Sequence, residues 1–273
     1  MRNKLEESAA DEVIVPVKGY GDQEGGASMQ PRRPLFLSAA ARGLTLVETA
    51  IMLVMVGLLI EFVIKGRELV QNARVRDIIS QQGAAESAFL AFQDRFHAPP
   101  GDFSAASANL NCGTYVCLNG NGNGRIEPGT GGAIHEEILA WQHLSAAGFI
   151  NGNFQMPSAT ITAPAPGNTP SSVFGGYLEV VTDNQFGYSG NTASRNNIKT
   201  GNYVPAAVLA EVDRKVDDGL PGTGRFRFST YAAAGPAPVV GGTPNGCTDT
   251  DSVSASWLEA NGSDNCGAAT LLY

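Results

Sequence analysis

One apolar segment, residues 44–64, constrains this 273-residue chain more than any other feature. Its sequence is LTLVETAIMLVMVGLLIEFVI, in which Glu48 and Glu61 are the charged residues. Since about 20 apolar residues in a helix are enough to cross the hydrocarbon core of a bilayer, the segment predicts a transmembrane helix. A carboxylate one turn into such a helix is costly in lipid unless it is paired. We therefore expect Glu48 to need a cationic partner.

The flanks of this segment indicate its orientation and its processing. Three arginines precede it, which favours a cytoplasmic N-terminal side, although four basic residues follow it and weaken the asymmetry. An ordinary secretory signal has its small-residue cleavage site after the apolar run, whereas residues 39–43, AAARG, lie before it. Cleavage after Gly43 would leave the apolar helix attached to the protein. The flanking basic residues are Arg32, Arg33 and Arg42 on one side and Lys65, Arg67, Arg74 and Arg76 on the other.

The junction at Gly43 resembles a known family. Residues 42–48, RGLTLVE, resemble the cleavage signal of type IV prepilins and type II secretion pseudopilins, and residues 54–59 and 65–74 are similar to the helix of that family. The resemblance implies cleavage by a prepilin peptidase between Gly43 and Leu44, with N-methylation of Leu44. In an assembled filament, the Leu44 amino group of a neighbouring subunit could neutralise Glu48.

The chain departs from this family in two details before the helix. Leu44 stands where the family usually has phenylalanine, and residues 1–43 form a long leader. Residues 1–28 are polar without apolar periodicity, whereas the sequence from Met29 reads as a shorter basic leader. We therefore expect translation to begin at Met29.

Apolar residues continue after residue 64 at steps of three and four, down to Pro99 and Pro100. This spacing predicts one helix from Leu44 to about Arg95, transmembrane over residues 44–64 and amphipathic over 65–98. The stripe consists of Val75, Ile78, Gln82, Ala85, Phe89, Phe92 and Phe96.

Residues 99–273 predict an extracytoplasmic α+β head that begins with a turn at 99–102. Helices are expected over 134–147 and 206–218, ended by Gly148 and Gly219, and strands over 173–182 and 225–231. The first of these helices should present Ile134, Ile138, Trp141 and Leu144 on one face. A long N-terminal helix packed on an antiparallel-sheet head is the type IV pilin-like fold, and several head motifs also resemble those of minor pilin-like proteins.

Four cysteines follow the apolar segment as two local pairs, Cys112 with Cys117 and Cys247 with Cys266. Neither pair has the Cys-x-x-Cys spacing of a zinc site, and the pattern suits disulfides in an oxidising compartment. Three connectivities are open; we favour the two local bridges, with reduced structural thiols as the alternative. The second pair also resembles the C-terminal disulfide loop of pilins.

Residues 119–127, NGNGNGRIE, alternate oxygen-bearing side chains with glycine, as calcium loops do. Asparagine oxygens are neutral, and position 12 of such a loop would be Thr130 rather than a bidentate glutamate. A weak extracellular calcium site and a plain glycine-rich turn are therefore both open. The candidate ligands are Asn119, Asn121, Asn123 and Glu127, with Glu136 or Glu137 as possible completions.

Asp213, Asp217 and Asp218 are a second candidate metal group, at the end of a predicted helix where the macrodipole disfavours anions. Either Arg214 and Lys215 or a bound cation is expected to compensate them, and a solvated helix end is the plain alternative. No cofactor is certain, and calcium is the one that the sequence suggests.

The net charge and the absence of catalytic motifs argue against two classes of function. The formal net charge of −8 belongs entirely to residues 44–273, and a negative field repels phosphate backbones, so no nucleic-acid partner is expected. His135 lacks the second histidine of a zinc-protease helix, and residues 187–191, GYSGN, lack the last glycine of a nucleophile elbow. We do not expect an enzyme.

The sequence therefore predicts a structural subunit of a type IV pilus or a type II secretion pseudopilus in the bacterial inner membrane. The head would lie in the periplasm or on an extracellular filament. The expected partners are a prepilin peptidase, other pilins or pseudopilins, an inner-membrane assembly platform and membrane lipid. A low-copy tip or adhesive minor pilin is the main alternative, and an enzyme mounted on a pilin-like stem is the third.

Overall fold

The computed structural model describes residues 44–130, 132–232, 235–241, 246–260 and 262–272. Internal contacts divide the chain between Met52 and Leu53, so the residues on either side are described separately. The α+β class is as predicted. The elements are α1 (Leu46–Phe96), α2 (Ala106–Asn109), α3 (Glu136–Ala146), β1 (Glu179–Asp183), β2 (Arg195–Lys199), α4 (Ala206–Val216), β3 (Phe226–Phe228) and β4 (Ala268–Leu271).

Helix α1 has 51 residues and confirms the predicted long N-terminal helix. His97 ends it in a left-handed conformation (φ 54°), and Pro99 and Pro100 follow, which lack the N–H group that a further turn would need. The predicted stripe is buried except at Phe96, which is half-buried. The buried residues of α1 are Val75, Ile78, Gln82, Ala85, Ala88, Phe89 and Phe92.

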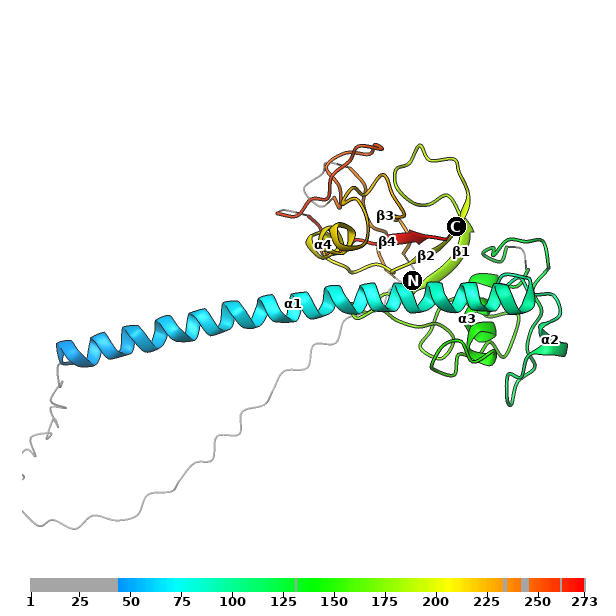
Figure 1. Ribbon diagram of the computed structural model, residues 1–273, viewed down its shortest axis with the longest axis horizontal. Helices are drawn as coiled ribbons and strands as arrows, with labels where there is room; N and C mark the ends of the chain where they lie inside the picture. The colour runs from blue at the N-terminus through cyan, green and yellow to red at the C-terminus, as the bar shows by residue number, and fades with distance from the viewer. Residues whose placement is uncertain (1–43, 131, 233–234, 242–245, 261, 273) are drawn as a thin grey trace, which may run out of the picture. The chain divides into compact units, whose positions relative to one another are not determined.

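The four strands form one antiparallel sheet in the order β1-β2-β4-β3. The register aligns Val180, Ile198, Thr270 and Phe226 in one row across it. Thr270 donates its hydroxyl to Gln82 of α1 over 2.9 Å, so this row faces the helix. In Figure 1 the C-terminal half of α1 runs alongside α3 and the strands. The architecture of this part of the chain is pilin-like.

Two buried apolar clusters join α1 to the rest of the head. The first places Val75 and Ile78 against apolar residues of α4, β3 and β4. The second places Phe89 and Phe92 against Trp141 of α3 and against apolar residues of β1 and β2. Helix α1 therefore covers the sheet together with α3 at one end and α4 at the other.

Helix α3 differs from its prediction in burial but not in position. Every residue from Glu136 to Leu144 is buried, so the helix packs on all sides rather than on one face. Its end is as expected: Gly148 is left-handed (φ 77°), and its N–H donates to Ser145 while Phe149 donates to Leu144, over 3.0 Å each. This is the double hydrogen bond of a Schellman cap.

The strands are shorter than predicted, and half of them were missed. Strand β1 begins at Glu179, not at Val173, and β3 covers three residues of the expected 225–231. Strands β2 and β4, together with the short helix α2, were not predicted. Helix α4 ends at Val216, and Gly219 is left-handed (φ 81°) three residues later.

Candidate assembly helix and head-domain sites

The first turn of α1 contains Glu48, the candidate assembly residue. Gly43, the predicted cleavage position, lies outside the described residues, and the description begins at Leu44. The Glu48 N–H donates to the Thr45 hydroxyl oxygen over 3.2 Å. Because the helix begins at Leu46, Thr45 and Glu48 occupy its N-cap and N3 positions, and this hydrogen bond is the Thr45 half of a capping box. A carboxylate at N3 is also favourable beside the positive end of the helix dipole, a local role that the Thr-x-x-Glu spacing signals.

Large apolar side chains cover the N-terminal half of α1, and the structure leaves them exposed. Within the described part of the chain, α1 is the one helix long and apolar enough to span a membrane, and none of that span is buried. Apolar surface on this scale needs lipid or other helices as its environment. The exposed large residues run from Leu44, Leu46, Val47, Ile51 and Met52 through Leu53, Val54, Met55, Val56, Leu58, Leu59, Ile60, Phe62, Val63 and Ile64 to Leu69 and Val70.

The asparagine–glycine segment is a loop built around two buried carboxylates. Asp102, in the turn after α1, accepts the N–H groups of Asn123 and Gly124 over 2.9 and 2.7 Å. Glu136, in the first turn of α3, accepts the N–H of Asn121 over 2.8 Å. Burial raises the pKa of the Glu136 carboxyl. The loop thus ties the end of α1 to the start of α3, and no local sequence motif indicates this use of Asp102.

The candidate calcium ligands in this loop already have hydrogen-bond donors. Each of the three asparagines accepts one backbone N–H through Oδ1, over 2.8 to 2.9 Å. Glu127 accepts from the Arg125 side chain over 2.9 Å. Calcium binding would need the same oxygens to face a cation, and it stays a prediction. The asparagine donors are Ser107 for Asn119, Asn123 for Asn121 and Arg125 for Asn123.

The structure brings the three candidate aspartates at the end of α4 together. Carboxylate oxygens of Asp213, Asp217 and Asp218 lie within 4.8 Å of one another. Burial raises the pKa of Asp213 to about 6. The group ties the end of α4 to residues 219–226, and cation binding here also stays a prediction. Its donors are Trp257 and Gly219 for Asp213, Arg225 and Phe226 for Asp217, and Leu220 and Thr223 for Asp218.

Arg214 and Lys215, which were expected to compensate these aspartates, form ion pairs with other carboxylates. The Arg214 guanidinium pairs with Glu259, and the Lys215 Nζ lies 2.6 Å from Glu211, one helical turn earlier. The aspartates instead accept hydrogen bonds from the Trp257 indole, from backbone N–H groups and from the Thr223 hydroxyl.

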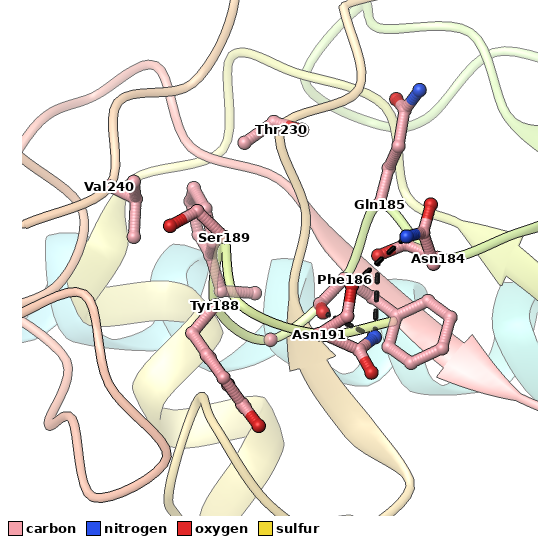
Figure 2. Close-up of a pocket in the computed structure, with 10 residues that line it drawn as sticks. Asn184, Gln185, Phe186, Tyr188, Ser189, Asn191, Thr230 and Val240 are labelled. Carbon is pink, nitrogen blue, oxygen red and sulfur yellow. Dashed lines mark hydrogen bonds between the residues drawn. The ribbon is translucent and has the colours of Figure 1, made fainter. Parts of the chain in front are cut away.

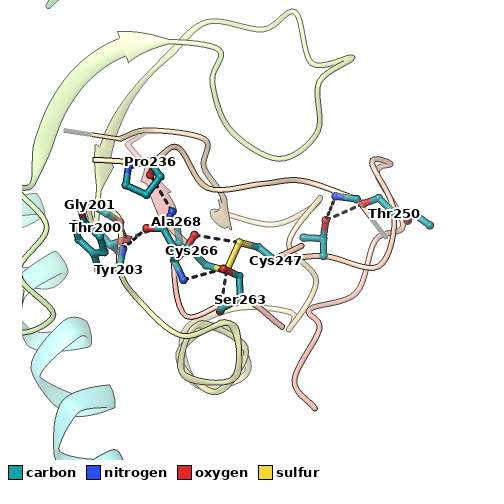
Figure 3. The surroundings of a disulfide bond; sticks show 12 residues. Thr200, Gly201, Tyr203, Pro236, Cys247, Thr250, Ser263, Cys266 and Ala268 are labelled. Carbon is teal, nitrogen blue, oxygen red and sulfur yellow. Dashed lines mark hydrogen bonds between the residues drawn. A yellow bond between two sulfur atoms is a disulfide. The ribbon is translucent and has the colours of Figure 1, made fainter. Parts of the chain in front are cut away.

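Both local disulfides favoured by the sequence are present, Cys112–Cys117 and Cys247–Cys266, and all four cysteines are buried. Figure 3 shows the second bridge close to Ala268, the first residue of β4. Cys266 also exchanges two backbone hydrogen bonds with Val204, of 2.8 and 3.1 Å. This bridge therefore holds the approach to β4 against the cluster around α4.

A pocket of about 200 Å³ opens beside the loop between β1 and β2 (Figure 2). The Asn191 side chain at its edge donates to the carbonyl oxygens of Asn184 and Phe186 over 3.3 and 3.1 Å. This amide therefore shapes the loop. Most of residues 187–191 line this pocket, but the segment lacks the last glycine of a nucleophile elbow, and isolated amide residues in a loop form no motif.

No protein-family model, curated protein or solved structure matches this chain. The indications of function therefore come from the fold and from the exposed apolar helix. Together they establish an α+β, pilin-like architecture with a helix of membrane-spanning length and two disulfides.

Proposed function

We propose that this protein is a structural subunit of a type IV pilus or of a type II secretion pseudopilus. In this proposal the precursor is inserted in the bacterial inner membrane with its head on the extracytoplasmic side. A prepilin peptidase cuts it after Gly43, and an inner-membrane platform assembles it with other subunits through the apolar helix.

The observation that carries the proposal is the division of α1. Its N-terminal half is apolar and exposed, while its C-terminal half is packed on an antiparallel sheet of the same chain. A helix with this division can anchor the subunit in lipid and can then exchange lipid for neighbouring helices, without unfolding the head.

Glu48 would guide this exchange. In lipid an unpaired carboxylate near the start of the helix is unfavourable, and a cut after Gly43 would create an amino group at Leu44. The amino group of a neighbouring subunit would then neutralise Glu48 within the apolar bundle, which favours assembly in one register.

The test is co-expression of the full chain with a prepilin peptidase, followed by intact-protein and N-terminal mass spectrometry. Cleavage after Gly43 in the wild type, blocked in Gly43→Ala, is the expected result. An uncleaved chain beside an active control substrate would reduce the protein to a signal-anchored head and refute the proposal.

The capping role of Glu48 can be separated from its charge. Glutamine keeps the capping-box geometry but not the charge, so Glu48→Gln should be cleaved yet fail to enter filaments. Glu61→Val is the matched control, because it removes the other carboxylate of the apolar segment, and it should assemble. Normal filaments from Glu48→Gln would show that Glu48 only caps the helix.

A further inference from the structure

A cavity of about 170 Å³ lies between α3, β1, the loop at 162–169 and residues 231–232. Two carboxylates line it, Glu137 from α3 and Glu179 from β1, with 8% and 7% of each residue exposed. The Tyr231 ring and apolar side chains complete the wall, among them Ile138 and Leu178. The cavity therefore combines buried negative charge with apolar surface.

Two cations contact these carboxylates directly, Lys199 and His135. Lys199, 1% exposed, lies 3.0 Å from Glu179 and also pairs with Asp183, so two carboxylates share its charge. His135 lies 2.6 Å from Glu137. With the carboxyls of Glu137, Glu179 and Asp183 ionised, this group has an excess negative charge even when His135 is protonated.

Within the described ranges, one buried carboxylate oxygen of the group receives neither a hydrogen bond nor an ion pair from another residue. Oε1 of Glu137 meets His135, but Oε2 is buried and has no hydrogen bond from another residue in the described ranges. A buried carboxylate oxygen of this kind is costly unless a ligand or a proton satisfies it. Burial raises the pKa of the Glu137 carboxyl and that of Glu179, the latter to about 7. Both carboxyls therefore hold a proton more readily than exposed carboxyls do.

We propose that this cavity binds a primary alkylammonium group, with the ammonium beside Glu137 and Glu179 and the alkyl chain along Ile138 and Leu178. The Tyr231 ring, which lies 5.2 Å from the Lys199 ammonium, forms part of the same wall. A divalent metal fits less well: within the described residues, the carboxylate group close enough to hold one is at Asp213, not here.

The test is calorimetric titration of the full chain in detergent micelles with n-butylammonium chloride. Saturable binding at one site is expected. The Glu137→Gln variant should weaken it at least about tenfold, because a charge-assisted hydrogen bond is lost. The matched control is Glu259→Gln, whose carboxylate is half-exposed on Arg214, and it should bind as the wild type does.

Three results would overturn the proposal: no saturable binding to the wild type, equal affinity for n-butanol, or unchanged affinity in Glu137→Gln. If n-butylammonium binds, Nα-acetyl-lysine amide distinguishes the source of the amine. Tighter binding of the lysine compound points to a lysine side chain of a partner protein, and weaker binding points to a free alkylamine. The proposal does not depend on filament assembly, because the cavity lies within the head.

Discussion

The two halves of α1 have opposite surroundings, although the helix is continuous between them. Toward its N-terminus, Leu46 and Leu53 are 85% and 74% exposed, whereas Val75 and Phe92 in the other half are fully buried. The first half is apolar on every side, and the second is apolar on one stripe. The periodicity of a helix therefore indicates where its partner lies: a stripe fits a partner in the same chain, and an all-round apolar surface requires lipid or other chains.

Truncation of a buried aromatic residue tests this difference most strongly. Phe92 packs its ring 5.9 Å from that of Phe103 and 6.3 Å from that of Phe149. Phe92→Ala should lower the free energy of unfolding of the head by about 4 kcal/mol. Leu59→Ala, at a residue 62% exposed, should change it by less than about 0.5 kcal/mol.

Urea unfolding in detergent, followed by tryptophan fluorescence, measures both values, because Trp141 lies in the same cluster as Phe92 and Trp257 lies in the other cluster of the head. Equal losses in the two variants would mean that the N-terminal half of α1 also has a partner inside the chain.

Acid pH should weaken the packed half through His143, which is fully buried and stacks on the Phe92 ring at 6.0 Å. Its Nδ1 accepts the Gly101 N–H over 2.9 Å, so the neutral ring donates from Nε2 to the Leu118 carbonyl, also over 2.9 Å. Burial lowers the pKa of His143 from 6.5 to about 4.

The unfolded chain therefore binds a proton that the folded chain excludes as the pH falls from 6.5 to about 4. The contribution of His143 is complete above pH 6.5 and should decline by about 3 kcal/mol over that range. Unfolding curves at several pH values should show this slope, and His143→Gln should remove it. Burial raises the pKa of Glu179 to about 7, so its contribution to stability grows, rather than declines, as the pH falls from 7 to 4.5. The effect of His143 is therefore read from the difference in unfolding free energy between the wild type and His143→Gln.

The elements predicted from the sequence are those with strong local signals. Helices α1, α3 and α4 have apolar residues at helical spacing and glycine or proline after their ends, and each lies close to its prediction. The two central strands, β2 and β4, were missed because their sequences, RNNIK and AATL, look polar or small. Their burial depends on partners distant in the chain, such as the carboxylates of Glu179 and Asp183 that meet Lys199.

The candidate sites, like the helices, could be predicted only where a local sequence motif indicates them. Leu44, Glu48 and the cysteine pairs come from local motifs, so the sequence alone was enough to propose them. The cavity at Glu137 and Glu179 joins side chains 42 positions apart through the packing of α3 on β1, and no motif connects them. The role of Asp102 in the asparagine–glycine loop was missed for the same reason, whereas Glu136 had been placed beside this loop as a possible calcium ligand.

The two disulfides differ in whether they support the first buried turn of α1. Cys247–Cys266 belongs to the cluster that contains Val75 and Ile78, whereas Cys112–Cys117 does not. Replacing Cys247 and Cys266, 19 residues apart, with serine should cost about 3 kcal/mol, against about 2 kcal/mol for Cys112 and Cys117, 5 residues apart. Hydrogen exchange should also quicken at Val75 and Ile78 in the variant without Cys247–Cys266, and not in the other. Equal exchange there in both variants would show that the bridge does not support this turn.

The smallest expected effect concerns an ion pair between α1 and the residue before β3. Glu86 pairs with Arg225, and their side chains are 26% and 40% exposed, so solvent screens the pair. Glu86→Gln should lower the free energy of unfolding by less than about 1 kcal/mol. Its control is Glu68→Gln, which breaks the exposed 3.0 Å pair with Lys65 and should have an effect of a few tenths of a kcal/mol at most. If Glu86→Gln instead cost as much as Phe92→Ala, charge rather than apolar packing would hold the C-terminal half of α1 to the sheet, and the contrast between the two halves would need another cause.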